Sequence, residues 1–437
     1  MTIRCIVMGA AGRDFHDVMT FFRSHDHFRV MAITAHQIPF IDQRAFPREL
    51  AGPAYDADIP IHLERELPRL IRELEVELVF LSYSDLAHED VMHRASIVQA
   101  AGASFVLLGP RQIQLRSSLP VVAVTAARTG AGKSPLSQAI ARHLKSRGAR
   151  VGILRHPMPY GDLRAQAVQR FASPEDLDRH HCTIEEREEY APYVDAGQVV
   201  FAGVDYATIL AHAEKESDVI LWDGGNNDVP FVAPSLWIVV VDALRPGHEA
   251  RYYPGETNLR SADVVVINKI SGATPEGLAT VRANVAALRP TARVIESDLE
   301  VTADDAAALA GRRVIVIEDG PTLTHGGMPS GAGLVAARNV GAHPIDPRPF
   351  AVGTIAQAYR DFPHLGPVLP ALGYSDAQIR ELSETIAAAR PDAILDASPA
   401  HATTWIAHAA PAHRARYRFV QRGGPDLLAL VDAALSR

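Results

Sequence analysis

The chain has 437 residues, a formal net charge of −8, 47% hydrophobic residues and 22% charged residues. This length exceeds what one hydrophobic core usually supports, so we expect two or three domains of ordinary globular composition. The negative charge disfavours a general nucleic-acid-binding surface. Only two cysteines, Cys5 and Cys182, are present, without metal-type spacing, and no apolar run is long enough to predict a membrane span. A cytoplasmic protein without a disulfide scaffold is expected.

Predicted strands and helices alternate from the start of the chain. Strands are expected at 3–8, 28–34, 78–82 and 104–108, with helices at 17–24, 63–74 and 89–101. The alternation predicts a Rossmann-like parallel-sheet domain over residues 1–118. Gly9 and Gly12 follow the first strand, but the third glycine of the dinucleotide fingerprint is absent. A NAD enzyme is therefore disfavoured, and either a smaller anion or a simple turn is expected at this loop.

A second alternating unit is expected over residues 119–340. Its strands are almost continuous runs of Val, Ile and Leu, at 121–125, 150–154, 219–222, 236–241 and 264–267. Such runs are typical of a sheet that helices cover on both faces. The glycine-rich segment 319–333 is too long for an ordinary connection and predicts a functional or disordered loop. Residues 341–437 are expected to form a C-terminal α/β extension, as a separate unit or as part of the second domain.

The most specific motif follows the strand at 121–125. The run Thr129-Gly130-Ala131-Gly132-Lys133-Ser134 has the parts of a nucleotide-binding P-loop at the start of a helix. In such a loop the backbone N–H groups cradle a polyphosphate, Lys133 reaches the β and γ oxygens, and Ser134 binds Mg²⁺. We therefore interpret residues 119–340 as a P-loop NTPase domain.

The loop departs from the common pattern in a way that narrows its class. Ala127 stands where the first glycine is usual, and Arg128 follows it. This variant resembles the loop of the dethiobiotin synthetase, MinD and signal-recognition group of nucleotidases, in which a lysine often occupies the place of Arg128. The resemblance implies a homodimer that completes its site across a two-fold axis. Arg128 would then act on its own nucleotide or on that of the partner.

The carboxyl ends of the neighbouring strands supply further candidates, because these ends line the ligand crevice of an open α/β sheet. Asp223 ends an apolar strand in the Walker B manner, which predicts a Mg²⁺ ligand. Gly224 and Gly225 follow it and allow the backbone to approach a γ-phosphate. Arg155 and His156 end the strand at 150–154 and are expected beside the P-loop.

Asn268 and Lys269 stand where related nucleotidases bind the base. Ser271 replaces the carboxylate that pairs with guanine, so ATP is favoured over GTP. Downstream of Arg155, the segment 180–190 mixes histidines with acidic residues. The adjacent histidines lack zinc spacing, and Glu188 is interpreted either as part of a helix face or as a group that acts on Mg²⁺ or a proton.

These segments together resemble the cyclic 2,3-diphosphoglycerate synthetase family along nearly the whole chain. The segments that carry the resemblance are 9–16, 129–134, 155–163, 181–190, 223–228 and 318–328. The resemblance implies a cytoplasmic, ATP-dependent and Mg²⁺-requiring ligase that joins the two phosphates of 2,3-diphosphoglycerate into a cyclic anhydride and releases ADP and phosphate. No covalent enzyme nucleophile is needed for this reaction.

Within this resemblance the catalytic candidates are Lys133, Arg128, Arg155, His156 and Asp223. The candidates for binding a small anionic substrate are Arg155, His156, Arg187, Glu188, Gly224, Gly225 and His325. Arginine is favoured among them for its bidentate pairing with phosphate. Neither a nucleic-acid partner nor a membrane partner is expected.

Two other functions stay open. A regulatory or metallochaperone GTPase is allowed by the P-loop and the many histidines, but the broken Asn-Lys-x-Asp pattern and the absent metal spacing disfavour it. The other is an ATP-dependent ligase that activates a different phosphorylated or carboxylated metabolite, as dethiobiotin synthetase does. Comparison of ATP and GTP hydrolysis with and without 2,3-diphosphoglycerate separates the three.

Overall fold

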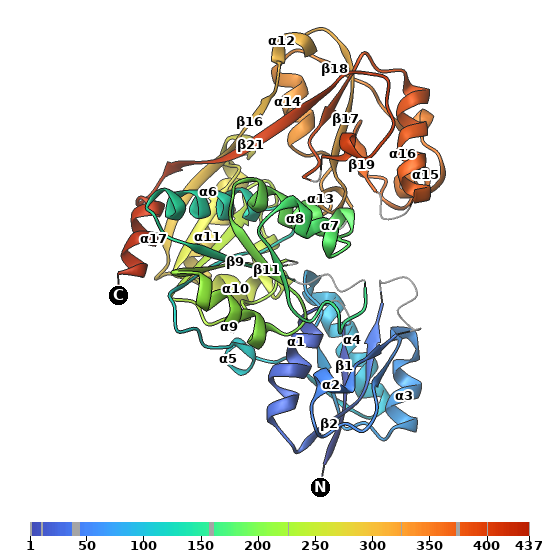
Figure 1. Cartoon of the computed structure of the whole chain (residues 1–437), viewed down its shortest axis with the longest axis vertical. Coiled ribbons are helices and arrows are strands. Elements are labelled where there is room, and N and C mark those ends of the chain that lie inside the picture. The colour runs from blue at the N-terminus through green and yellow to red at the C-terminus, as the bar shows by residue number, and fades with distance from the viewer. Residues whose placement is uncertain are drawn as a thin grey trace.

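The computed structural model describes residues 2–9, 12–36, 44–156, 161–225, 227–324, 326–372, 376–399 and 401–436, without the side chains of Ile184, Glu185, Pro321 and Asp376. It confirms the predicted α/β class. A six-stranded N-terminal sheet lies beneath a much larger sheet that the rest of the chain builds (Figure 1).

The N-terminal unit is a mainly parallel sheet with the strand order β3-β4-β2-β1-β5-β7. Its strands are β1 (Ile3–Met8), β2 (Phe28–Ala35), β3 (Ala45–Phe46), β4 (Ile59–Leu63), β5 (Leu78–Leu81) and β7 (Ser104–Val106). Its helices are α1 (Arg13–Thr20), α2 (Arg48–Ala51), α3 (Leu67–Glu73), α4 (His88–Ala101) and α5 (Pro110–Ile113). Only β3 runs antiparallel to its neighbour, so the unit has the Rossmann-like alternation that the sequence predicts.

The P-loop unit has the strand order β10-β11-β9-β12-β8-β13-β15-β16. Its strands are β8 (Val121–Ala126), β9 (Val151–Arg155), β10 (Gln169–Phe171), β11 (Val199–Ala202), β12 (Val219–Asp223), β13 (Leu236–Asp242), β15 (Val264–Asn268) and β16 (Arg293–Ala303). Its helices are α6 (Lys133–Ser146), α7 (Pro174–Arg179), α8 (Ile184–Asp195), α9 (Tyr206–Glu216), α10 (Gly255–Ser261) and α11 (Pro275–Leu288). Every residue of β8, β9, β12, β13 and β15 is buried, as the apolar runs predict.

Helices cover both faces of this sheet. On one face, Leu136 and Ile140 of α6 pack with Tyr193 of α8. On the other face, Tyr206 and Ile209 of α9 pack against the strands. Because the central strands are parallel, their carboxyl ends meet at one edge, and this edge carries the P-loop, Arg155, Asp223, Asp242 and Asn268.

A long antiparallel ladder joins this sheet to the C-terminal strands. β16 pairs with β21 (Ala412–Gly423), and the sheet continues through β20 (Ala393–Asp396), β17 (Arg313–Asp319) and β18 (His343–Pro344), with β19 (Leu369–Ala371) also on β17. The helices here are α12 (Ala306–Leu309), α13 (Gly320–Leu323), α14 (Ala332–Asn339), α15 (Gly353–Asp361) and α16 (Asp376–Ala389). The last helix, α17 (Leu427–Leu435), returns to pack on the P-loop unit.

The C-terminal unit begins earlier than the sequence predicts. β17 and α14 precede the expected boundary at residue 340, yet β17 pairs with the C-terminal strands rather than with the P-loop strands. The segment 412–423 also forms a strand that the sequence does not predict. Its arginines alternate with other residues and pair across the ladder, Arg416 with Asp304 and Arg418 with Glu300. An exposed, charged ladder lacks the apolar run that marks a buried strand.

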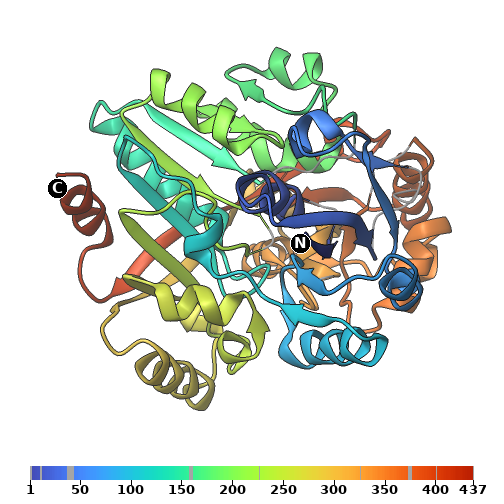
Figure 2. The same cartoon turned by 90° about the horizontal axis from the view of Figure 1, so that it is seen from below.

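The N-terminal unit is attached to the P-loop unit by backbone as well as side chains. β6 (Leu86–Ala87) forms a two-stranded antiparallel pair with β14 (Tyr252–Tyr253). The His16 ring of α1 stacks on Phe231, with the ring centroids 4.0 Å apart. Figure 2 views the molecule from this side, with the N-terminal sheet toward the reader. None of the helices in the described part of the chain has the length and apolar content needed to cross a membrane.

The start of α10 packs so closely on the residue after β8 that a side chain at Gly255 is expected to destabilise the fold. A Cβ atom on Gly255 would overlap the carbonyl of Ala127, directly before the P-loop. We expect Gly255→Ala to cost about 2 kcal/mol of unfolding free energy and to lower Tm by roughly 5 °C, measured by calorimetry. Gly109→Ala is the control, since its nearest neighbour would lie at an ordinary 3.8 Å. Equal stability of the two variants would contradict this packing.

Candidate active site

The P-loop connects the carboxyl end of β8 to the first turn of α6. Gly130 and Gly132 have φ angles of 78° and 103°, in the left-handed region that side chains disfavour. A Cβ atom on Gly132 would also overlap the side-chain amide of Asn268. The two glycines therefore allow the concave turn that a polyphosphate requires.

Two carbonyl oxygens of the loop accept hydrogen bonds from side chains that follow β15 or end it. Lys269 Nζ donates to the Gly130 carbonyl at 2.6 Å, and Asn268 Nδ2 donates to the Ala131 carbonyl at 2.8 Å. These bonds turn the negative ends of the peptide dipoles away from an incoming phosphate. The sequence predicts that Asn268 and Lys269 bind the base, whereas the structure places both against the loop itself. Base binding by these two residues stays a prediction.

The centre of the site is the Asp223 carboxylate, which has no exposed surface at the end of β12. One oxygen, Oδ1, accepts from Lys133 Nζ at 2.5 Å and from Ser137 Oγ at 2.9 Å. The other, Oδ2, accepts from Tyr193 Oη at 2.6 Å and from the Arg155 guanidinium. Four hydrogen-bond donors compensate for the burial of this charge. The donors come from β9, α6 and α8, so these elements meet at the Asp223 carboxylate at the end of β12.

The charges of this cluster shift the pKa values of its members. Burial alone would raise the pKa of Asp223, but Arg155 and Lys133 outweigh it and hold that pKa well below its usual range. Burial lowers the pKa of Lys133 to about 8, against the opposing effect of Asp223. Arg155 also pairs with Glu189 of α8, so its guanidinium lies between two carboxylates. Lys133 therefore keeps its charge at neutral pH and loses it in mildly alkaline solution, as the pH rises through its pKa of about 8.

The residues fit a magnesium ion that keeps most of its waters. The predicted ligands are Ser134 in the first turn of α6 and Asp223, and Mg²⁺ in P-loop enzymes is held by such a hydroxyl and carboxylate with phosphate oxygens. Since four donors already occupy Asp223, its contact with the ion would be through water. No cluster of three His, Cys, Asp or Glu side chains suited to a metal occurs among the described residues.

The N-terminal unit holds the P-loop from one side. Asp85 of this unit pairs with Arg128 at 3.2 Å and accepts from the Thr129 backbone N–H at 3.4 Å. The Arg128 guanidinium also lies 3.7 Å from the centre of the Tyr252 ring. Arg128, predicted to assist phosphoryl transfer, is thus held within its own chain beside the loop.

A second buried network connects His156 to the N-terminal unit. His156 Nδ1 lies 2.7 Å from Asp228 Oδ2, and Ser84 donates to the other oxygen of Asp228. Burial would raise the pKa of Asp228, but His156 and Arg13 hold it below its usual range. Arg13 Nη2 in turn donates to Tyr253 Oη at 2.9 Å. His156 therefore lies next to the end of β12, and its partner Asp228 connects it to Ser84 of the N-terminal unit.

The glycine-rich segment after β17 also lies next to the loop. Arg245 donates both to the Thr129 carbonyl at 2.7 Å and to the Gly326 carbonyl at 2.6 Å, so it bridges the two segments. A Cβ atom on Gly130 would lie 3.1 Å from Thr322. The P-loop therefore has contacts with both the N-terminal unit and this C-terminal segment.

The other predicted residues fall in different places. Gly224 and Gly225 are buried directly after Asp223, and a Cβ atom on Gly225 would lie 2.9 Å from His156. Arg187 and Glu188 lie on α8, where Arg187 pairs with Asp178 of α7 at 2.6 Å and lies 5.0 Å from the centre of the Trp405 ring of the C-terminal unit. His325 lies outside the described residues. All five remain predictions as substrate ligands.

Two members of the Asp223 cluster are missed by the sequence. Ser137 follows Lys133 by four residues on α6, and Tyr193 follows Glu189 by four residues on α8. Residues four apart share a helix face. The spacing from Lys133 is a signal in the sequence that places Ser137 on the side of α6 that faces the site. The contact of Tyr193 with Asp223 depends on how α8 packs, which the sequence does not indicate.

Fold and site define a nucleotide-binding P-loop enzyme. Comparison with curated proteins finds arginine synthetase ArcE of Thermococcus kodakarensis, 52% identical over 430 residues that cover 98% of this chain and 96% of the relative. The chain therefore belongs to the ArcE family. The relative is named a synthetase, and cyclic 2,3-diphosphoglycerate synthetase, which the motifs resemble, is not named among the matches.

No family model matches the chain. Among solved structures, LpxK of Aquifex aeolicus in complex with ATP aligns with a TM-score of 0.41 and 12% identity, over 79% of this chain and 95% of that one. A DUF1611 protein of Anabaena variabilis aligns with a TM-score of 0.23 and 10% identity, over 67% and 94%. Both are too distant to bear on the activity.

The lowered pKa of Lys133 predicts a pH-dependent affinity for ATP. Phosphate binds the ammonium form, whose fraction in the free protein falls as pH rises through the Lys133 pKa of about 8. We expect the Kd for ATP, measured by calorimetry, to rise about tenfold between roughly pH 7 and pH 9. Lys133→Arg keeps its charge over this range and should lose most of the slope. The same slope in both proteins would contradict this assignment.

Proposed function

We propose that this chain is an ATP-dependent synthetase that forms arginine from a ureido amino acid and ammonia, with release of ADP and phosphate. The observation that carries the proposal is the convergence of Lys133 and Arg155 on Asp223 beside a P-loop, in a chain 52% identical to arginine synthetase ArcE. A P-loop with a lysine and an arginine positioned beside it can transfer a phosphoryl group to an acceptor.

The balance of charge around the loop supports an acceptor without phosphates. Lys133 and Arg155 share Asp223, and Arg128 pairs with Asp85. Lys269 and Arg245 both pair with Asp242 at 2.9 Å. Each of these cations has a carboxylate partner, so little net positive charge remains beyond what the phosphates of ATP require. A bisphosphate acceptor would need more, whereas a neutral ureido group would not.

The proposed reaction has two chemical steps. ATP supplies the γ-phosphoryl group, which the ureido oxygen of the acceptor takes as ADP leaves. Ammonia then forms the new C–N bond at the ureido carbon, and the C–O bond breaks so that phosphate leaves with the former ureido oxygen. Phosphorylation makes this oxygen a leaving group, so no covalent enzyme nucleophile is needed.

The residues of the site have roles in that reaction that follow from their charges. Lys133 and Arg155 neutralise the charge that develops on the transferred phosphoryl group. Asp223 fixes both cations through hydrogen bonds, and Tyr193 and Ser137 fix Asp223. Asp85 of the N-terminal unit and Arg245, which also contacts Gly326, hold the loop in place.

The cyclisation of 2,3-diphosphoglycerate is the second candidate, because the motifs at 155–163 and 318–328 resemble that family. A homodimer also stays a prediction. The ion pair of Arg128 with Asp85 of its own chain supports action in its own subunit rather than across an interface.

The proposal predicts a reaction that needs all three substrates. With ATP, Mg²⁺, citrulline and ¹⁵N-ammonium, we expect ¹⁵N-arginine by mass spectrometry in amounts equal to the ADP formed. Omission of citrulline or ammonium should abolish arginine, and GTP should replace ATP poorly. A new cyclic-phosphate ³¹P signal with 2,3-diphosphoglycerate, and no arginine, would instead establish the second candidate. GTP hydrolysis that needs no acceptor would contradict both.

Lys133→Met should lower the rate of arginine formation by about 10²- to 10³-fold, because it removes a cation from the transferred phosphoryl group. Lys145→Met is the matched control at the other end of α6, where Lys145 Nζ donates to the carbonyls of Ala196 and Gly197. Equal loss in the two variants would indicate a general effect on folding.

A further inference from the structure

A cavity of about 190 Å³ lies where the N-terminal unit meets the P-loop unit. One wall is the end of α1 together with the short 3₁₀ helix that follows it, Phe22–Ser24. The other wall is the start of α9 and the segment after α5, and Figure 1 shows α1, α5 and α9 meeting at this junction. Because a cavity of roughly 150 Å³ holds a benzene molecule, this one has room for a small organic ligand.

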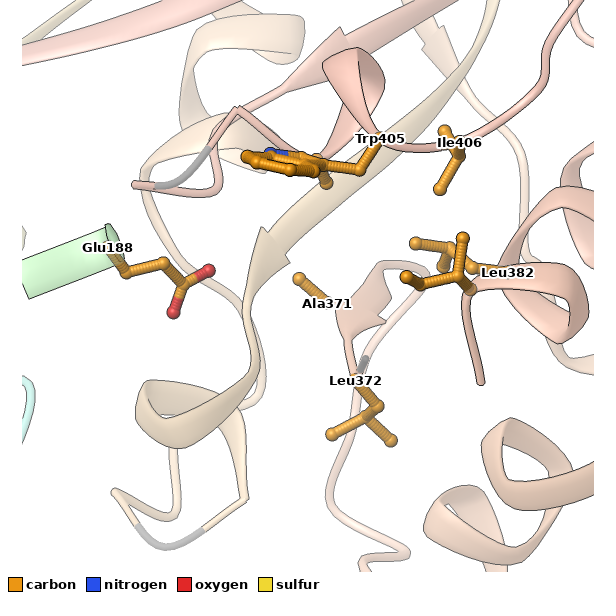
Figure 3. Close-up of a pocket in the computed structure, with 8 residues that line it drawn as sticks. Glu188, Ala371, Leu372, Leu382, Trp405 and Ile406 are labelled. Carbon is orange, nitrogen blue, oxygen red and sulfur yellow. The ribbon is translucent and has the colours of Figure 1, made fainter. Parts of the chain in front are cut away.

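Another cavity, beside α8 and the C-terminal unit, is much smaller. Figure 3 shows Glu188 of α8 on one side of it and Leu382 and Ile406 on the other. Its volume is about 20 Å³, which is room for about one water molecule. Size therefore favours the cavity between α1 and α9 as a ligand site.

Two opposite charges line the larger cavity, and they do not pair with each other. Among the described residues, the exposed Arg23 has neither a hydrogen bond nor an ion pair. Asp205 accepts two hydrogen bonds from Thr208 in the first turn of α9, and no cation within the described part of the chain pairs with it. A carboxylate can accept about four hydrogen bonds, so Asp205 has capacity left for a ligand. His16 also lines the cavity, but burial lowers its pKa to about 4, so its ring is neutral.

The remaining lining is partly polar and partly aliphatic. Ser24 Oγ donates to the carbonyl of Thr20 and can accept a further hydrogen bond. Met19, Leu115 and Ala207 add apolar surface. The cavity therefore offers one cation, one carboxylate, a hydroxyl and an aliphatic wall to the same ligand.

We propose that this cavity binds a zwitterionic α-amino acid with an aliphatic side chain. Its carboxylate pairs with the Arg23 guanidinium, its ammonium pairs with Asp205, and its side chain packs against Met19 and Leu115. This site differs from the P-loop site and is independent of the arginine synthesis proposed above.

The cavity is connected to the active site through aromatic side chains. Tyr206 lines the cavity, and its hydroxyl donates to the carbonyl of Arg155. The His16 ring stacks on Phe231, whose ring centre lies 6.0 Å from that of His156. Among the described residues, none from the P-loop lines the cavity. An amino acid bound here is thus in the position of an effector, next to side chains that support the active site, rather than in the position of a phosphoryl acceptor.

Calorimetric titration of the full chain with L-leucine tests the proposal. Two analogues serve as matched probes, because 4-methylpentanoate lacks only the ammonium of L-leucine and 3-methylbutylamine lacks only its carboxylate. We expect L-leucine to bind, and each analogue to bind about fivefold or more weakly, since each loses one charge pair.

Two variants test the residues that form these charge pairs. Arg23→Gln and Asp205→Asn should each weaken the binding of L-leucine about fivefold or more. Asparagine caps a helix as well as aspartate does, so Asp205→Asn keeps the cap of α9 and the fold. Arg72→Gln on α3 is the control for loss of an exposed arginine and should leave binding unchanged.

No binding of L-leucine up to about 10 mM would overturn the proposal. Equal affinity for L-leucine and either analogue would do the same, as would unchanged binding in Arg23→Gln or in Asp205→Asn. Competitive displacement of L-leucine by ADP would place it in the P-loop site and would also reject the proposal. None of these outcomes bears on the synthesis of arginine, which the titration does not require.

Discussion

The neutralisation of one buried carboxylate determines the arrangement of the active site. Asp223 has no contact with solvent and is ionised only because Lys133 and Arg155 surround it. Removing either cation would leave a buried charge incompletely paired, which costs several kcal/mol. The first turn of α6, the end of β9 and the face of α8 are therefore fixed relative to β12. The cations that would bind a nucleotide phosphate are therefore already in place before the nucleotide binds. The phosphate would compete with Asp223 for Lys133.

The three parts of the chain have related roles around this centre. The N-terminal unit holds the P-loop through Asp85, and the segment after β17 is bridged to the same loop by Arg245. The loop itself is shaped by glycine and supported beneath by Asn268 and Lys269. The active site thus depends on contacts between units, and a P-loop domain alone would have a more open and more hydrated site.

Much of the fold and part of the site can be predicted from the sequence. The buried parallel strands appear as apolar runs, and residues at their carboxyl ends, such as Asp223 and Arg155, must share an edge. Tyr193 could not be found in this way, because its contact depends on the packing of a helix far away in sequence. The strand β21 carries alternating arginines and pairs on an exposed ladder, so no apolar signal marks it. β17 likewise pairs only with C-terminal strands, which its apolar run alone does not indicate.

In the proposed reaction the acceptor oxygen, rather than water, takes the phosphoryl group from ATP at the P-loop. Citrulline labelled with ¹⁸O at the ureido oxygen tests it most directly, with ATP and ammonium in ordinary water. We expect one ¹⁸O atom in each phosphate released and none in the arginine formed. Unlabelled phosphate formed together with arginine would contradict it.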